Sequence, residues 1–400
     1  MSKCDVIVIG GGISGLSFAW GAAARGREVT VLDAAPRLGG CLHSPRTADG
    51  YWFELGAHTA YNSYSGLLAI LEGVGLMDRL LPREKLPFRM LVAGELRSVA
   101  KELSLLRLFG SLPRMPFTKK DGRTVKEYFS RLVGKRNYER VLAPMLAAVP
   151  SQPADDFPAT MLFKKRPRRK DVLRSFTVDG GLQTVTDAIA ASPRVTTRPD
   201  TAVAAVAPDG AGFAVTLASG ERLVAEHVAV ALPPDAAARV VAGAWPALAE
   251  ALAKVAVVAV DSLGVVVASD QIGLPSVAGV VPKERDAFYS VVTRDVVPDA
   301  THRAFTFHFA AGSAPGDRLA RALSVLGVGE DAVAATYERQ SRLPSPKPGH
   351  PALVAAMDAA LADSRLALTG SYFAGLAIED CIGRSNAELA RVSRQSGSVS

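Results

Sequence analysis

Three glycines near the N-terminus have the spacing of a dinucleotide-binding loop. Gly10-x-Gly12-x-x-Gly15 follows the β-branched run at 5–9 and opens an Ala-rich helical pattern that extends to about residue 25. In such a loop the first glycine allows a tight turn, the second lets the backbone approach a pyrophosphate, and the third lets the helix pack on the strand. The phosphates would then meet free N–H groups and the positive end of the helix dipole. The alternative is a glycine-rich strand–helix turn that binds no ligand.

A carboxylate and a guanidinium follow at positions that suit the same ligand. A second strand at 28–32 ends on Asp33, where a carboxylate can accept hydrogen bonds from an adenosine ribose. Arg37 precedes Gly39-Gly40, so a guanidinium and bare backbone can approach the pyrophosphate a second time. Nicotinamide enzymes do not need this second clamp, and the sequence has no second GxGxxG. We therefore expect FAD, and we expect no metal, because the sequence has no metal-ligand motif.

Several further segments resemble the flavin-containing amine oxidase superfamily, which includes protoporphyrinogen oxidases, carotenoid desaturases and monoamine oxidases. The resemblance runs nearly end to end and is closest to the porphyrinogen oxidases. It departs from them at Ala57, where those enzymes have proline, and in 144–149, where a glycine is missing. Besides the N-terminal βαβ unit, the similar segments are FELGAHT at 53–59, PMLAAV at 144–149, FTVDGGLQT at 176–184, PGH at 348–350 and TGSYFAGLAIEDCI at 369–382.

The resemblance implies non-covalent FAD binding and a set of residues for it. It implies an FAD-dependent oxidoreductase of porphyrin biosynthesis that takes a hydride from a substrate C–H to flavin N5, with a porphyrinogen-like tetrapyrrole as substrate. No catalytic side chain is implied, because the cofactor carries the chemistry. The implied contacts are Gly10, Gly12, Ser14, Gly15, Asp33, Arg37 and Gly40 for the ADP half, Gly56, Ala57 and Ile378 for the flavin ring, the Val203 backbone for adenine, and Gly370 and Ser371 for the ribityl chain and phosphates.

Other functions within the same superfamily stay open. The chain could be an amine oxidase or a carotenoid-type desaturase, and a homologue that binds FAD without catalysis is a third hypothesis. An amine oxidase would need an aromatic pair flanking its substrate, for which the terminal motif offers Tyr372 and Phe373.

Three side chains beside these motifs have a functional and a structural interpretation. His58 could relay protons in the flavin-facing loop, or it could be satisfied by local hydrogen bonds. Cys381 could attach flavin covalently, as in monoamine oxidases, but we expect a buried, packed cysteine, and we expect the same of Cys41. The three cysteines, which include Cys4, are far apart in the sequence. This spacing argues against a disulfide framework and fits a reducing compartment.

Positive charge is concentrated in one part of the chain. The 400 residues carry a formal charge of +7, but 101–174 hold 18 Lys and Arg against 7 Asp and Glu, a local +11 that leaves −4 elsewhere. The run KKRPRRK at 164–170 contains no aromatic residue, so we expect no nucleic-acid partner. A solvated loop is one interpretation of the run. The other is contact with an anionic membrane or with a carboxylate-bearing small-molecule substrate.

The elements that would position these residues indicate an α/β fold with three parts. A Rossmann-like FAD-binding domain is expected at 1–75, 175–254 and 360–394, a basic helical insert at 76–174, and an α+β substrate domain on an antiparallel sheet at 255–359. Period-two patterns predict a three-stranded meander in 201–232 and further strands in 255–310. Helices are expected at 318–326, 352–361 and about 376–392, with a strand at 366–369.

The N-terminus and the hydropathy pattern bear on location. MSKCDVIVIG has neither a charged leader nor a cleavage site, and the most apolar stretch, 255–268, is short and contains Asp261. We therefore expect a cytoplasmic protein that is attached at most to a membrane surface.

Overall fold

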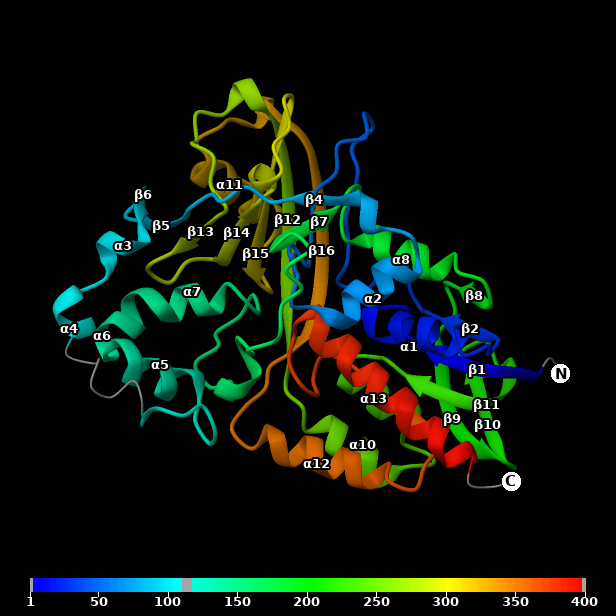
Figure 1. Cartoon of the computed structure of the whole chain (residues 1–400). Helices are drawn as coiled ribbons and strands as arrows, with labels where there is room; N and C mark the ends of the chain where they lie inside the picture. Colours follow the sequence, from blue (N-terminus) through cyan, green and yellow to red (C-terminus); the bar gives the residue numbers. More distant parts are fainter. Residues whose placement is uncertain (1–2, 110–116, 398–400) are drawn as a thin grey trace.

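The computed structural model describes residues 3–109 and 117–397, and two seven-stranded sheets organise it (Figure 1). The first has the order β8-β2-β1-β11-β10-β9, with β17 paired to β11, and the second has the order β16-β12-β15-β14-β13-β5-β6. Figure 1 shows the first sheet at the right, the second at the upper left, and helices α5–α7 below the second. The expected α/β class with two differently built sheets is confirmed.

The first sheet is the expected Rossmann-like sheet. β8, β2, β1, β11 and β17 pair with one another in parallel. On its edge away from β1, β11 also pairs with β10, and β9, β10 and β11 form the antiparallel meander predicted for 201–232. Helices α1, α8 and α13 pack on it. The bounds are β1 Lys3–Ile9, α1 Ile13–Ala23, β2 Val29–Leu32, α8 Gln183–Ala190, β8 Val195–Arg198, β9 Val203–Asp209, β10 Gly212–Leu217, β11 Arg222–Val230, β17 Leu366–Leu368 and α13 Ile378–Gly397.

The second sheet has one apolar and one polar face on its central strands. Along β15, Phe305, Phe307 and Phe309 enter a core with helix α11 (Pro315–Leu326), and the alternate residues Thr306 and His308 point to the other face. That other face meets the segment around 51–58 from the first domain. The strands are β12 Val257–Ala268, β13 Gly279–Pro282, β14 Phe288–Thr293, β15 His302–Ala310 and β16 Val333–Pro344.

The predicted helical insert is wrong at its N-terminal end. β4 (Leu80–Pro82) pairs with β7 (Ser175–Val178), and the hairpin of β5 (Phe88–Val92) and β6 (Glu95–Ser98) joins the second sheet through β13. Ala93 and Gly94 make the two-residue turn with φ of 50° and 84°, a conformation that hairpins favour. A two-residue turn between strands, rather than helical spacing, was therefore the informative signal.

The rest of that segment is mainly helical. Residues 110–116 of the expected insert lie outside the described residues. The elements are α3 Val99–Glu102, α4 Leu105–Phe109, α5 Val125–Val133, α6 Lys135–Asn137, a π-helical turn Tyr138–Leu142 and α7 Ala143–Ala147.

Later elements agree with the sequence except for one strand and two helices. α11, α12 (His350–Ala360), β17 and α13 lie where they were expected. Strand β16 and helices α9 (Pro234–Val241) and α10 (Pro246–Ala253) were not predicted from the sequence. Strand β16 was missed because the side chains on its inner face include arginine and serine as well as apolar residues. The sequence therefore shows no clear alternation of polar and apolar residues, although every second residue is partly covered.

Candidate functional site

The glycine loop has the geometry that a phosphate ligand requires. Gly10 has φ of +107°, and a Cβ on Gly15 would lie 1.9 Å from the Gly10 carbonyl oxygen, so the strand and helix approach as closely as only glycine permits. Helix α1 then starts at Ile13 with no side-chain cap and no acidic residue in its first turn. The amides and the positive dipole end of α1 are thus not neutralised by a side chain of its own, which fits an anionic ligand.

The carboxylate of Asp33 lies beside this loop. It accepts hydrogen bonds from the Gly11 amide at 2.6 Å and from the Ala35 amide at 2.8 Å. The Thr201 amide donates to the Asp33 carbonyl at 2.7 Å, and Val203 begins β9 two residues later. The structure therefore brings the residues expected at ribose and adenine to the same end of the first sheet.

Two arginines from different domains converge on the Gly40 carbonyl. Arg37 donates to it through Nη2 at 2.8 Å, and Arg339 of β16 donates to the same oxygen through Nη1. Burial and the neighbouring Arg339 lower the pKa of Arg37 to about 10. The hydrogen bonds of both guanidiniums in the described part of the chain go to carbonyls, so their charge is available to a diphosphate. Arg339 was missed because β16 was missed.

Two of the residues expected near the flavin ring, Gly56 and Ala57, pack against the loop that contains Gly40 and Cys41. The Ala57 amide donates to the Cys41 carbonyl at 3.0 Å, and a Cβ on Gly56 would lie 2.1 Å from that oxygen. The 40–41 and 56–57 loops are therefore in direct contact, and only glycine fits at position 56. Gly12, Gly40, Gly56 and Ala57 form one continuous backbone surface, since Gly40 also lies against Gly12.

The terminal segment reaches the same surface through α13. Ser385 Oγ contacts Thr369 Oγ1 at 2.8 Å and donates to the Ser14 carbonyl at 2.7 Å, linking β17 to the start of α1. Gly370 and Ser371 follow Thr369 directly, and Ile378, which is buried, begins α13. These contacts place Thr369, which directly precedes Gly370 and Ser371, beside the start of α1.

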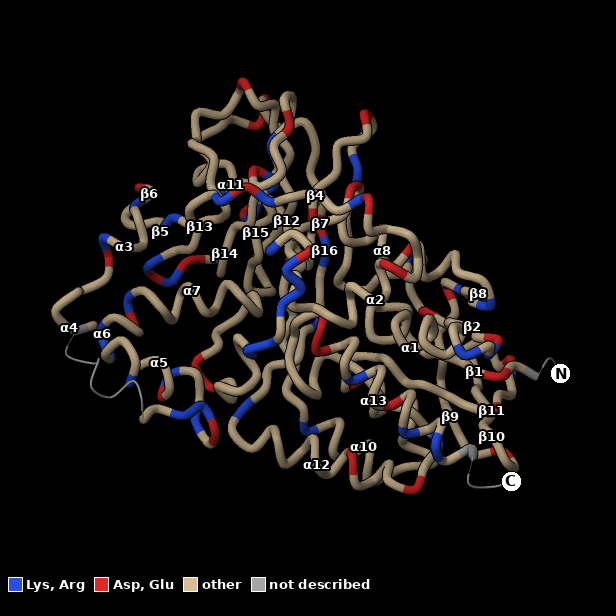
Figure 2. The backbone as a smooth tube through the Cα atoms, in the orientation of Figure 1, with Lys and Arg blue, Asp and Glu red and all other residues tan. Residues whose placement is uncertain are grey.

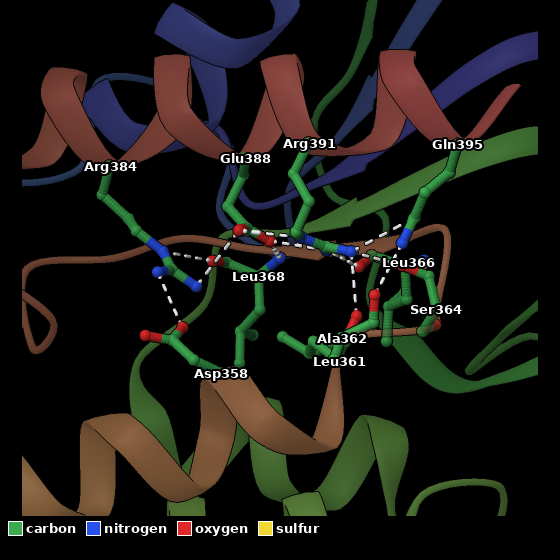
Figure 3. A network of polar contacts seen from close by, with 10 residues as sticks. All are labelled: Asp358, Leu361, Ala362, Ser364, Leu366, Leu368, Arg384, Glu388, Arg391 and Gln395. Atoms are coloured by element: carbon green, nitrogen blue, oxygen red, sulfur yellow. Dashed lines mark hydrogen bonds and ion pairs between the residues drawn. The ribbon is translucent and has the colours of Figure 1, made fainter. Parts of the chain in front are cut away.

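A charged network under β17 holds that segment in place (Figure 3). Arg391 of α13 donates to the carbonyls of Leu361, Ser364 and Leu366, and it pairs with the buried carboxylate of Glu388 at 2.8 Å. Glu388 also accepts the Leu368 amide at 3.1 Å. These bonds fix the chain between α12 and β17, from which Gly370 and Ser371 extend.

The expected histidine lies in a chain of three polar side chains. His58 Nε2 is 3.1 Å from His308 Nε2, and His308 Nδ1 is 3.0 Å from Ser262 Oγ. Burial, His308 and Arg83 hold the pKa of His58 well below its usual range. Burial lowers the pKa of His308 to about 4, so both rings are neutral at pH 7. His58 is hydrogen-bonded, as its structural interpretation expected, but its partner is a second histidine from the other domain.

His308 and Ser262 were not singled out in the sequence. The alternation Phe305-Thr306-Phe307-His308-Phe309 was the available signal, because it places a histidine on the strand face opposite three phenylalanines.

A buried carboxyl group shares a cavity with His58. Glu54 accepts hydrogen bonds from Ser44 Oγ at 2.7 Å and the Leu182 amide at 2.7 Å. Burial nevertheless raises its pKa to about 7. Glu54, His58, Arg83 and other side chains line a cavity of about 20 Å³, which has room for about one water molecule.

The two candidate cysteines differ in environment. Cys381 is buried in α13, and burial raises the pKa of its thiol to about 12. At neutral pH this thiol stays protonated and is a poor nucleophile. Cys41 is exposed and directly follows Gly40, so the expectation that it packs in the interior is wrong.

The basic run divides into paired and exposed residues. Lys164 and Arg166 contact Asp380 of α13 at 2.9 and 2.7 Å, and Arg169 pairs with Glu72 of α2 (Ser65–Gly73). Lys165, Arg168 and Lys170 are exposed. Figure 2 shows the run as a blue stretch at the centre of the molecule, beside the start of α13. Half of its cations therefore fasten the chain to the first domain.

Two further properties concern the described residues alone. Within 3–109 and 117–397, no group of three or more His, Cys, Asp or Glu side chains is arranged to hold a metal ion. Within the same residues, no helix combines the length and the apolar character needed to cross a membrane.

Comparison with known proteins gives a family match over most of the chain. The family model for flavin-containing amine oxidoreductases matches residues 13–268. The chain is 35% identical over 78 residues to a Synechococcus elongatus protein provisionally named zeta-carotene desaturase, which is 20% of this chain and 16% of that protein. It is 31% identical over 106 residues to coproporphyrinogen III oxidase of Propionibacterium freudenreichii, 26% of this chain and 20% of that enzyme. These alignments thus span at most about a fifth of either relative.

A similar fold covers the whole chain. A crystal structure of an Exiguobacterium protein, provisionally named protoporphyrinogen oxidase, superposes with a TM-score of 0.77 over 99% of this chain and 100% of that one. The two sequences are 16% identical, so this likeness shows the fold alone.

Proposed function

The chain belongs to the flavin-containing amine oxidoreductase family, and from this premise we propose that it is an FAD-dependent oxidoreductase acting on a porphyrinogen-like tetrapyrrole. FAD, when bound, supplies the acceptor for a hydride from a substrate C–H. The chain's own residues bind and orient it. Under this proposal the α1 amides, Arg37 and Arg339 hold the diphosphate, and Asp33 holds the ribose.

The packing of the two aromatic residues in the terminal motif distinguishes between the substrate hypotheses. Tyr372 and Phe373 contact each other, with ring centroids 4.7 Å apart and planes tilted by 33°, and both belong to the apolar core around β11 and β17. The guanidinium of Arg384 covers the Phe373 ring at 3.7 Å. An aromatic pair used in this way cannot flank an amine substrate. The observation therefore favours the porphyrinogen hypothesis, which the terminal motif also supports, over amine oxidation.

The test is the spectrum of the purified protein and its response to substrates. The proposal expects a yellow protein, or one that gains a flavin spectrum with FAD, and anaerobic coproporphyrinogen or protoporphyrinogen should bleach it. A panel of primary and secondary amines should leave the spectrum unchanged. Bleaching by an amine alone would favour the amine oxidase hypothesis, and bleaching by a carotene in detergent would favour a desaturase. A flavin spectrum that no substrate bleaches would favour the hypothesis of a homologue that binds FAD without catalysis.

We further propose that FAD is bound without a covalent bond. The buried, protonated thiol of Cys381 supports this, because a thiolate is the attacking species. Denaturation in acid should then release all yellow colour into the supernatant. Colour that stays with the precipitated protein would refute the proposal. The variants C381S and C41S would then show which cysteine carries the flavin.

We also propose that the exposed half of the basic run contacts an anionic membrane surface. Lys165, Arg168 and Lys170 have no ion pair among the described residues, and the neighbouring Phe163 side chain is 59% exposed. Near a membrane each cation contributes about 1 kcal/mol, so neutralising all three should weaken binding to anionic vesicles by roughly 100-fold. Zwitterionic vesicles and a variant lacking three exposed cations elsewhere are the controls. Unchanged binding would assign the run to a solvated loop.

A further inference from the structure

We propose that Ser262, His308 and His58 form a proton relay between the cofactor site and Glu54. The inference rests on the proposed oxidoreductase function. One end of the relay lies at the cofactor loops, because Ser262 is the cross-strand neighbour of Arg339, which is bonded to Gly40. The other end lies at the cavity that His58 shares with Glu54.

The sheet register places the relay in one row. Ser262 on β12 lies between Arg339 on β16 and His308 on β15, and Ser290 on β14 follows His308. All four residues are cross-strand neighbours, so they lie on the face that meets the first domain. Ser262 and His308 are 5% and 4% exposed, which shields the relay from bulk water.

Two neutral imidazoles joined through Nε2 have two arrangements of protons. In one, His308 carries its proton on Nε2 and donates to His58, and Ser262 donates to His308 Nδ1. In the other, His58 donates to His308 Nε2, and His308 Nδ1 donates to Ser262 Oγ. The 3.1 Å and 3.0 Å separations fit both arrangements. Conversion of the first into the second moves one proton along the chain without leaving a charge on it.

This movement matches the proton balance of a two-electron oxidation. With the cofactor bound, two-electron oxidation of a substrate would release one proton at this site, and Ser262 would take up a proton as its own hydroxyl proton passes to His308 Nδ1. The Nε2 proton of His308 passes to His58 Nε2, and the Nδ1 proton of His58 passes through a cavity water to the Glu54 carboxylate. Reduction of a two-electron acceptor such as O₂ to peroxide consumes a proton, so the relay then runs backwards. The rings return to their first arrangement without rotating.

Glu54 is suited to hold the proton between the two half-reactions. It is buried, and its carboxyl oxygens accept the Leu182 amide and Ser44 hydroxyl, with Thr177 3.4 Å away. The charged and titratable groups that face it across the cavity are His58, Arg83 and Arg294. With a pKa raised to about 7, it can both take and release a proton near neutral pH.

The chain offers a matched pair of variants for the test. S262A removes the first member of the relay, and S290A removes the buried hydroxyl on the other side of His308, which has no hydrogen-bond partner among the described residues. In ¹⁵N NMR of the protein at pH 7 without added cofactor, S262A should change the tautomer populations of His308, and S290A should not. With FAD, S262A should slow bleaching by the tetrapyrrole by about 100-fold and S290A by less than threefold.

The Glu54 end has an independent measurement. Photochemical reduction of bound FAD needs no substrate, and its midpoint potential should show a break in slope near pH 7 that E54Q abolishes. If no tetrapyrrole bleaches the cofactor, the proposed function fails, but the NMR and potential measurements still test the relay. The relay is refuted if S262A and S290A act alike on His308, if His308 is charged at pH 7, or if E54Q keeps the break.

Discussion

Replacement of Arg391 by leucine should loosen the segment that precedes the terminal cofactor motif (Figure 3). The guanidinium bonds three backbone carbonyls and the Glu388 carboxylate, and its side chain is only 20% exposed. Hydrogen bonds from a charged group contribute about 1.5–3 kcal/mol each, and loss of one partner of a buried ion pair costs about 3–5 kcal/mol. Glu388 keeps Arg384 and the Leu368 amide as partners. We therefore expect R391L to lower the free energy of unfolding by about 3 kcal/mol, the lower end of that range.

The assay is urea unfolding at pH 7, combined with amide hydrogen exchange of 361–368. R391K keeps the charge but not the planar fork, and it should lose about half as much stability. The double variant R391L/E388Q should lose less than the sum of the single variants, by about 1 kcal/mol, because the two groups interact. This account of the network would be refuted if R391L had the same free energy of unfolding as the wild type, or if amide exchange became faster elsewhere but not in 361–368.

Three further predictions concern the cofactor site. G15A should fail to retain FAD, because its Cβ would lie 1.9 Å from a backbone oxygen, whereas G243A, where nothing lies within 4 Å, should bind FAD normally in calorimetry. R339M should weaken FAD binding by roughly 10–100-fold through the loss of a charge-assisted contact, and R342M, on the exposed side of β16, should not. Because the folded-state pKa of His308 is about 4, below the unfolded value near 6.5, His308 should cost the fold up to about 3 kcal/mol as the pH falls from 6.5 to 4, and H308Q should flatten this part of the stability–pH curve.

The cofactor half of the site was predictable because its constraints are local. Gly10 and Gly15 are required by a turn and a helix–strand contact within one βαβ unit, and Asp33 ends the next strand. Spacing in the sequence determines these positions almost completely. The meander at 201–232 was predictable for the same reason, since turn residues separate its three alternating strands.

The rest of the candidate site, which includes Arg339 and His308, depends on contacts between segments far apart in the sequence. Arg339 reaches Gly40 across 299 residues, and His308 reaches His58 across 250. Nothing local distinguishes Arg339 from Arg342, the other arginine of β16, because its role comes from the register of β16 against β12. The β5–β6 hairpin was mistaken for helix because segments on both sides of it have helical spacing, and its own structure is decided by pairing with β13.

The arginine pair explains how cofactor binding would join the two domains. Arg37 belongs to the first domain and Arg339 to the second sheet, yet both donate to the Gly40 carbonyl. Burial lowers the pKa of Arg37, and repulsion from the Arg339 guanidinium on the same oxygen lowers it further, to about 10. A diphosphate between them would relieve that repulsion, so its binding energy depends on both domains. The contact between Arg339 and Gly40 also places β16 against the cofactor loops, and with it the neighbouring Ser262 and His308. One strand register therefore positions both the Arg339 guanidinium and the proposed relay.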